Sequence, residues 1–209
     1  MNSDIIIIGA GPGGYETALY AAKKGLSVTL FEERRVGGTC LQEGCIPTKC
    51  FCRSAEVADT IAHCEAMGIG ATAPTVDMAR VVARKNEVVA QLTAGIEFLL
   101  KNKLITCIPE RAELLDAHTV KSASGETYTA RHILIATGST AKIPPIAGSD
   151  LPGVVTSTQL LDIDHIPSRL CIVGAGVIGL EFASIFRSFA SAIFSANSSR
   201  SCRPARISV

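Results

Sequence analysis

The amino-acid sequence predicts an α/β fold with two copies of a strand–turn–helix unit, and three observations support this. The run Ile5–Ile8 is apolar and β-branched, which is typical of a strand buried on both faces of a sheet. Glycine-rich residues 9–14 follow it directly and lead into a helical pattern. When the sequence is aligned with itself at an offset of 165 residues, the glycine-rich segment matches Gly174–Gly179. The same unit therefore recurs late in the chain.

Length and composition narrow the class of protein. A chain of 209 residues holds one large domain, or one domain and part of another. Hydrophobic residues make up 47% of it, which fits a globular rather than a disordered protein. The net charge of +1 gives no electrostatic basis for binding nucleic acid or an anionic membrane. Because the run Ile5–Ile8 is too short for a membrane span or a signal-peptide core, we expect a cytoplasmic protein with mostly reduced cysteines.

The first unit is complete in the sequence. A strand is predicted at Asp4–Ile8, a helix at Tyr15–Lys24 that ends at Gly25, and a second strand at Ser27–Phe31. Glu32 closes the second strand, where an acidic side chain can accept hydrogen bonds from a ribose hydroxyl.

The glycine turn between the first strand and the helix has the spacing of a dinucleotide-binding fingerprint. Gly9 makes the tight turn, Gly11 lets the backbone approach a pyrophosphate, and Gly14 lets the helix pack closely on the strand. The N-terminus of the helix then receives the negative charge. The full turn reads Gly9, Ala10, Gly11, Pro12, Gly13 and Gly14. These residues and Glu32 predict a Rossmann-like domain that binds a dinucleotide.

Residues 37–49 contain a cysteine pair, Cys40 and Cys45, in a setting that favours redox chemistry. On one regular helix their Cα atoms would lie roughly 8–9 Å apart, beyond the ~7 Å that a disulfide can bridge. Gly44 permits a bend that closes this gap, and Pro47 suits the first turn of a following helix. The N-terminus of that helix would stabilise a Cys45 thiolate.

Two other interpretations of the pair stay open from the spacing alone, namely inert small residues in a loop and half of a zinc site. Cys50 and Cys52 follow closely, but no compact Cys/His motif has zinc-ligand spacing, so we expect no metal site. Cys64, Cys107 and Cys171 lie among apolar residues and are expected to serve packing.

Two helices and several short strands are predicted in the middle of the chain. One helix covers roughly residues 48–67, and the second follows Pro74 and ends near residues 101–103. Thr137 and Gly138 follow the last strand, which would place them at the carboxyl edge of the sheet, where ligands gather. The predicted strands are Leu104–Ile108, Ala112–Leu115, Thr119–Lys121, Thr127–Ala130 and His132–Ala136.

We therefore expect residues 1–145 to form the first dinucleotide-binding domain, with an inserted helical pair and a small antiparallel layer. The segment Ile143–Gly148 breaks regular structure and marks the boundary. Residues 146–189 are expected to be a linker and the start of a second Rossmann-like unit. Its strand is predicted at Leu170–Val173 and its helix runs to Phe189.

Residues 190–209 are expected to be an anomalous tail. The displacement that aligns the two turns places Ala190 where the first unit has Gly25, and Asn197 where it has Glu32. The sequence beyond Ala196 is rich in serine and arginine, and its apolar residues do not recur with the periodicity of a helix or a strand. A natural linker is one interpretation, and a change of reading frame near Ala190 is our hypothesis. The gene sequence downstream tests it.

The residues together resemble the flavin-dependent pyridine nucleotide–disulfide oxidoreductases, and most closely the dihydrolipoamide dehydrogenase branch of that family. Leu41 and Ile46 favour this branch, since other branches tend to carry valine there. Gln42 departs from the family, which usually has asparagine at this position. The resemblance covers Asp4 to about Phe189 and rests on the first glycine turn with Glu32 and on residues 37–49, 136–139 and 174–181.

The resemblance implies a role for each candidate catalytic residue. Cys45 would be the thiol next to the flavin, and Cys40 would be the thiol that exchanges with the substrate sulfur. Lys49 would lie near the flavin and pair with Glu181. The implied cofactors are FAD and NAD(P). The residues implied to bind them are Gly9, Gly11, Pro12, Gly13, Gly14, Glu32, Gly38, Thr39, Lys49, Thr137 and Gly138 for FAD, and Gly174, Gly176 and Gly179 for the nicotinamide nucleotide.

Members of this family are roughly twice as long, act as homodimers and take a histidine–glutamate pair from a C-terminal domain. None of the four histidines here lies in such a motif. We therefore expect this chain by itself to have no substantial lipoamide activity and not to form the usual dimer. The implied partner is a lipoyl-bearing or other small disulfide substrate. Two alternatives stay open, a reductase of glutathione, coenzyme A disulfide or a metal ion, and a non-catalytic FAD-binding remnant.

Overall fold

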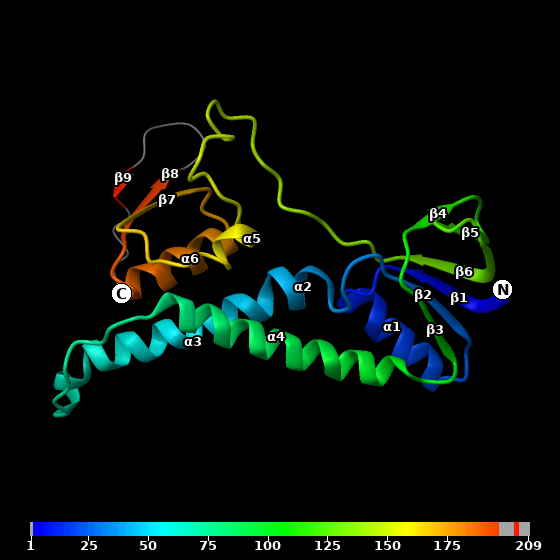
Figure 1. Ribbon diagram of the computed structural model, residues 1–209, viewed down its shortest axis with the longest axis horizontal. Coiled ribbons are helices and arrows are strands. Elements are labelled where there is room, and N and C mark those ends of the chain that lie inside the picture. Colours follow the sequence, from blue (N-terminus) through cyan, green and yellow to red (C-terminus); the bar gives the residue numbers. More distant parts are fainter. Residues whose placement is uncertain (1, 197–202, 205–209) are drawn as a thin grey trace. The chain divides into compact units, whose positions relative to one another are not determined.

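A computed structural model describes residues 2–196 and 203–204 of the chain. The chain divides into two units, each with its own sheet (Figure 1). Residues 1–45 and 89–140 form the first unit, and residues 46–88 and 141–209 form the second. This division differs from the linear boundary expected after residue 145, because the segment 46–88 groups with the second unit.

The first unit contains a six-stranded sheet in the order β3-β2-β1-β6-β5-β4. The strands β3, β2, β1 and β6 are parallel, and β6, β5 and β4 are antiparallel. The parallel strands end in register, since Ile8 pairs with Phe31 on one side and with Ile135 on the other. Their carboxyl ends therefore meet at one edge. The strands are β1 (Asn2–Ile8), β2 (Val28–Phe31), β3 (Ile105–Ile108), β4 (Ala112–Leu114), β5 (Thr119–Ser122) and β6 (Thr127–Ile135).

Helix α1 (Pro12–Lys23) follows β1 and covers the parallel strands. Its alanines are small enough to bring the helix close to the sheet, and Ala18 is fully buried against the strand residues Ile7 and Leu30. The helix begins three residues earlier than expected. Pro12 stands in its first turn, where the missing N–H is no loss and the fixed φ suits the helix.

Strand β6 is a single element, although the sequence predicted two strands at Thr127–Ala130 and His132–Ala136. Residues 127–129 of β6 pair with β5, and the register with β1 runs from Thr129 to Ile135. Arg131 therefore lies inside a continuous strand, because the long parallel partner holds the backbone extended across it.

Three α-helices and a 3-10 turn make up the expected helical insertion. Helix α2 spans Gly38–Glu43, α3 spans Cys45–Ala62 and α4 spans Met78–Leu100. The 3-10 turn η1 (Cys64–Met67) follows α3 and ends at Gly68, whose φ of 76° is the left-handed conformation that glycine adopts at a helix end. None of the described helices is long and apolar enough to cross a membrane.

The second unit repeats the β–α–β order of the first. Strand β7 (Arg169–Val173) leads through a glycine turn into α6 (Val177–Ser188), and β8 (Ala192–Ala196) then pairs parallel with β7. A short strand β9 (Arg203–Pro204) pairs antiparallel with β8, and α5 (Ser157–Leu160) precedes β7. The second strand of this unit thus lies within the segment expected to be an anomalous tail.

Ala190 takes a left-handed φ of 71°, as Gly25 does at 84° in the first unit. Both residues end the helix that follows a glycine turn, and alanine is strained in a conformation that glycine adopts freely. Asn197, which aligns with Glu32, lies outside the described residues, as do residues 198–202 and 205–209.

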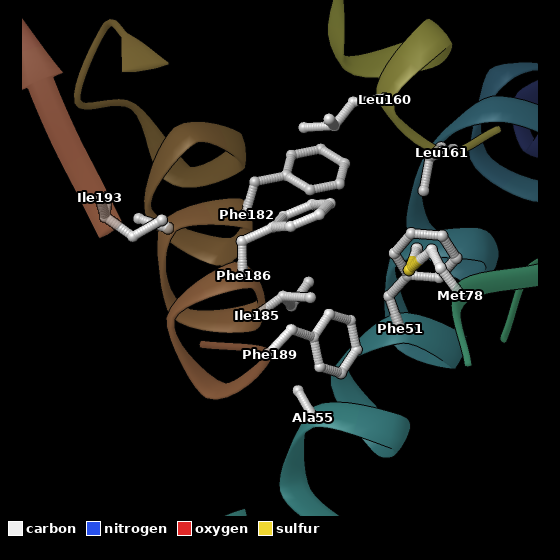
Figure 2. Close-up of a cluster of buried hydrophobic side chains, with 11 residues drawn as sticks. Phe51, Ala55, Met78, Leu160, Leu161, Phe182, Ile185, Phe186, Phe189 and Ile193 are labelled. Atoms are coloured by element: carbon white, nitrogen blue, oxygen red, sulfur yellow. The ribbon is translucent and has the colours of Figure 1, made fainter. Parts of the chain in front are cut away.

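The core of the second unit joins the inserted helices to the glycine-turn unit (Figure 2). Phe51 and Ala55 of α3 pack with three phenylalanines of α6 and its end. Two of the ring pairs have centroids 6.0 and 6.4 Å apart. This shared core is why residues 46–88 belong to the second unit. The three phenylalanines are Phe182, Phe186 and Phe189.

A buried cation on α4 is held by one ion pair. The side chain of Lys85 is 5% exposed, and its Nζ lies 2.5 Å from Oδ1 of Asp162. We expect Asp162→Asn to lower the free energy of unfolding by about 1–2 kcal/mol, because it leaves a buried ammonium without its counter-charge while Asp162 itself is largely solvated. Asp164→Asn, the same change at a carboxylate that is 90% exposed, should lower the free energy of unfolding by less. Equal losses in urea denaturation would contradict the role given to Lys85.

Candidate active site

A cleft of about 1190 Å³ opens at the carboxyl edge of the first sheet. It lies where β1, β2 and β6 end, which is where ligands bind in open α/β sheets. The cleft is larger than the ~300–1,000 Å³ of ordinary small-molecule sites, so it suits an extended ligand. Its lining includes Gly9, Gly11, Pro12, Gly13, Glu32, Gly38, Thr39, Cys40, Thr137 and Gly138.

The first glycine turn is closed so tightly that side chains are excluded. A Cβ on Gly9 would lie 2.3 Å from the carbonyl oxygen of Ala136, and Gly9 has a left-handed φ of 101°. A Cβ on Gly14 would lie 1.8 Å from the carbonyl oxygen of Gly9. Gly11 is the N-cap of α1 and has no side chain to occupy the helix N-terminus. An anionic group can therefore approach the positive end of the helix without meeting a side chain.

The cysteine loop touches this turn directly through two glycines. A Cβ on Gly38 would lie 2.7 Å from the Cα of Gly11, and Gly38 has a left-handed φ of 54°. The hydroxyl of Thr39 donates a hydrogen bond of 3.3 Å to the carbonyl of Ser139. The loop is thus fixed to the nucleotide turn on one side and to the segment after β6 on the other.

Glu32 is oriented by the backbone around it. One carboxylate oxygen accepts a hydrogen bond of 2.8 Å from the N–H of Ala10, and the other accepts one of 2.9 Å from Arg34. A carboxylate has about four acceptor positions, so it retains capacity for a ribose hydroxyl. Glu32 therefore joins the end of β2 to the glycine turn as well as lining the cleft.

The two cysteines lie on either side of a break between helices. Cys40 is on α2, is half-buried and lines the cleft. Cys45 is the first residue of α3, carries an exposed thiol and is not among the residues that line the cleft. Gly44 forms the break, and a Cβ there would lie 2.9 Å from the carbonyl oxygen of Thr39. The bend and the helix start predicted from the sequence are both present.

Lys49 and Glu181 belong to the second unit and are both exposed. Among the described residues they form no ion pair within 4.0 Å. Their common neighbour is Cys52 on α3. Burial raises the pKa of the Cys52 thiol, the charge of Glu181 raises it further, and the charge of Lys49 lowers it. A buried Lys49 held by Glu181, which motivated the expected pair, is thus absent from this arrangement.

The influence of Glu181 on Cys52 can be measured directly. We expect Glu181→Gln to speed the alkylation of Cys52 near pH 8 by roughly twofold to threefold, because removing a negative charge lowers the thiol pKa and raises the thiolate fraction. Lys49→Met should slow the same reaction. Peptide-resolved mass spectrometry after timed labelling separates Cys52 from the other thiols. Unchanged rates in both variants would show that neither charge acts on this sulfur.

The second glycine turn has the same local geometry as the first. Gly174 has a φ of 108°, and a Cβ on Gly179 would lie 2.4 Å from the carbonyl oxygen of Gly174. Gly176 is the N-cap of α6, as Gly11 is of α1. This turn belongs to the second unit, and its residues are not among those that line the cleft of the first.

Sequence reasoning missed several charged and polar groups at the cleft. Arg34 and Glu43 form an ion pair, and both line the cleft. Glu110 and Arg111, which follow β3, also line it. Because they follow a parallel strand, the sequence could have placed them at the edge of the sheet where ligands bind. In the part of the chain that the structure describes, no three His, Cys, Asp or Glu side chains are grouped to hold a metal ion.

The chain is similar in sequence to curated dihydrolipoyl dehydrogenases. A dihydrolipoyl dehydrogenase of Acholeplasma laidlawii is 42% identical over 195 residues, which cover 91% of this chain and 58% of that protein. The dihydrolipoyl dehydrogenase of Bacillus subtilis (strain 168) is 40% identical over 194 residues, covering 90% and 42%. The chain thus spans about half the length of these curated relatives.

The chain is also similar in structure to a solved flavoprotein disulfide reductase. The HOCl-induced flavoprotein disulfide reductase RclA from Escherichia coli superposes with a TM-score of 0.79 at 34% identity, over 92% of this chain and 41% of that one. The pyridine nucleotide-disulphide oxidoreductase family matches residues 3–202. Because that match includes both glycine turns and the cysteine loop, the chain belongs to the pyridine nucleotide-disulphide oxidoreductase family.

Proposed function

We propose that this chain is the flavin- and dithiol-bearing part of an FAD-dependent disulfide oxidoreductase that oxidises dihydrolipoamide with NAD⁺. The observation that carries the proposal is the close approach of Gly38 to Gly11. It joins the cysteine loop to the turn proposed to receive a dinucleotide, so that Cys40 lines the cleft in which the cofactor would bind.

The residues of the cleft fit FAD. The turn at Gly9 and Gly11 leaves the start of α1 open to a pyrophosphate, and Glu32, held by the N–H of Ala10, would accept a hydrogen bond from a ribose hydroxyl. The cleft has the volume for an extended dinucleotide. Thr137 and Gly138 also line it. When bound, FAD supplies the hydride chemistry between the dithiol and the nicotinamide nucleotide.

The cysteines would carry the exchange with substrate. One thiolate of dihydrolipoamide attacks the Sγ of Cys40 in the Cys40–Cys45 disulfide, and the Cys45 thiolate leaves. The second substrate thiol then displaces Cys40, so lipoamide is released and the protein holds the dithiol. Two electrons and two protons have passed from substrate to protein. The start of α3 stabilises the Cys45 thiolate, since the helix dipole is positive there.

The second glycine turn, with Gly174, Gly176 and Gly179, is the proposed site of the nicotinamide nucleotide. Its closed geometry matches that of the first turn and leaves the start of α6 free for a pyrophosphate. Lys49 and Glu181 retain a proposed role near the dithiol. We propose that substantial turnover, like the homodimer of the family, requires the part of the relatives' length that these 209 residues do not span, since they cover about half of it.

A second candidate is a reductase of another disulfide. The structural neighbour named above is a disulfide reductase, and the local geometry of the cysteine loop does not select the substrate. A full-length version, assayed with lipoamide, glutathione disulfide and coenzyme A disulfide, distinguishes the two. A rate with lipoamide that is no higher than with the other substrates would favour the second candidate.

Flavin binding is tested on the 209-residue chain itself. The purified protein should release close to one FAD per chain on denaturation, as measured by absorbance and chromatography. Gly38→Ala should remove most of this flavin, because its Cβ would strike the nucleotide turn. A folded chain that takes up no FAD even when excess FAD is added would overturn the proposed function.

A further inference from the structure

Gln42 makes two of the hydrogen bonds that attach helix α2 to the rest of the first unit. Its side-chain amide donates a hydrogen bond of 2.7 Å to the carbonyl of Val36 and another of 2.8 Å to the hydroxyl of Thr93. Val36 precedes the glycine pair of the loop, and Thr93 lies on α4. One side chain thus connects α2 to the loop before it and to a long helix.

The donors and acceptors in this chain of bonds are matched one to one. The carbonyl of Val36 can only accept, so the NH₂ of Gln42 must face it. The hydroxyl of Thr93 gives its own proton to the carbonyl of Val89 in a bond of 2.8 Å, and a lone pair remains to accept from Gln42. Both amide hydrogens are therefore used, and the orientation of the amide is fixed.

Helix α2 depends on such contacts. It has six residues, and an isolated helix of that length is not stable in water. Gln42 lies two positions after Cys40 and three before Cys45, so its anchorage fixes the segment that sets the distance between the two sulfurs. Disulfide formation requires a narrow range of Cα separations, and a loosened segment would satisfy it less often.

Asparagine, the usual residue in the family, cannot make both bonds here. It is shorter by one methylene, about 1.5 Å, and the two bonds are already at ordinary lengths. We propose that Gln42, together with Thr93, is a positioning residue that favours the approach of Cys40 to Cys45 when their disulfide forms. This inference rests on the proposed function, since it requires that the two cysteines form a redox pair.

The test measures the dithiol–disulfide equilibrium of the 209-residue chain. The protein is equilibrated in graded dithiothreitol buffers, free thiols are alkylated, and the fraction of Cys40–Cys45 disulfide is measured by mass spectrometry. Gln42→Asn and Thr93→Val should each disfavour the disulfide by about fivefold, the equilibrium change that the loss of one hydrogen bond produces. An asparagine that keeps the bond to the nearby Val36 loses the one to the distant Thr93, so both substitutions remove the bond between residues 42 and 93. The double variant should therefore show the same fivefold change. Thr93→Ser, which keeps the hydroxyl, should restore the wild-type equilibrium.

Two matched controls separate this effect from general destabilisation. Thr60→Val removes a hydroxyl with the same bond to a carbonyl four residues earlier, on α3. Gln91→Asn makes the same shortening at an exposed position of α4. Both should leave the equilibrium unchanged. Independent, additive shifts in the double variant, or wild-type values in both single variants, would overturn the inference alone. A wild-type chain that forms no Cys40–Cys45 disulfide in any buffer would defeat the proposed function as well.

Discussion

Gly14→Ala should abolish flavin binding and lower the free energy of unfolding of the first unit by at least about 3 kcal/mol. A Cβ at this position would lie 1.8 Å from the carbonyl oxygen of Gly9 and 3.4 Å from a methyl group of Ile7. The first contact is with backbone, so no change of rotamer relieves it. Helix α1 would have to move away from β1, and the N–H groups at its start would move with it.

The neighbouring Gly13 supplies a matched control for this substitution. It lies in the same turn of α1, but a Cβ there would meet only the Cβ of Ala136 at 4.0 Å, an ordinary contact. Gly13→Ala should therefore unfold at the wild-type denaturant concentration or higher, since alanine favours helix. Urea denaturation with flavin fluorescence measures both effects. Equal behaviour of the two variants would contradict the close packing of α1 on β1.

Gly44→Ala should shift the equilibrium between the Cys40–Cys45 dithiol and its disulfide toward the dithiol by roughly tenfold. The added Cβ would lie 2.9 Å from the carbonyl oxygen of Thr39 and 3.5 Å from the Cα of Cys40. The end of α2 and the start of α3 must separate to admit it. Because the disulfide requires the two segments to stay close, the substitution raises the free energy of the oxidised form more than that of the dithiol.

Gly95→Ala is the control for the second prediction. Gly95 lies inside α4, and nothing lies within 4 Å of a Cβ built on it. The substitution should stabilise the chain by about 0.5–1 kcal/mol and leave the thiol equilibrium unchanged. Quantification of the disulfide in dithiothreitol buffers measures the result. A Gly44→Ala chain with the wild-type equilibrium would show that the break between the helices does not control the pair.

Local chemistry made most of the first unit predictable from the sequence. The run at Ile5–Ile8, the turn glycines and the acid at Glu32 each have one structural use, and the structure places them at the edge of one sheet. The break at Gly44 followed from the geometry of a disulfide. Contacts between distant segments were harder to predict. The bond from Gln42 to Thr93 joins residues 51 positions apart, and no local pattern indicates it.

The division into units depended on the same kind of distant contact. Phe51 packs with Phe182 and Phe186, which assigns the inserted helices to the second unit. Only the linear order of the segments could be predicted from the sequence. The expected pair of Lys49 with Glu181 came from resemblance and from the cost of burying a lone charge. Both residues are exposed, so that cost does not arise in this structure.

The absorbance spectrum of the purified chain before and after mild reduction with a dithiol tests the central claim most directly. Cys40 lines the cleft, whereas Cys45 starts α3, so the spectrum also decides which sulfur contacts the flavin. The proposed function predicts a long-wavelength band that is retained in Cys40→Ser and lost in Cys45→Ser. A flavin-loaded chain whose spectrum shows no such band on reduction, or keeps it in Cys45→Ser, would contradict the account.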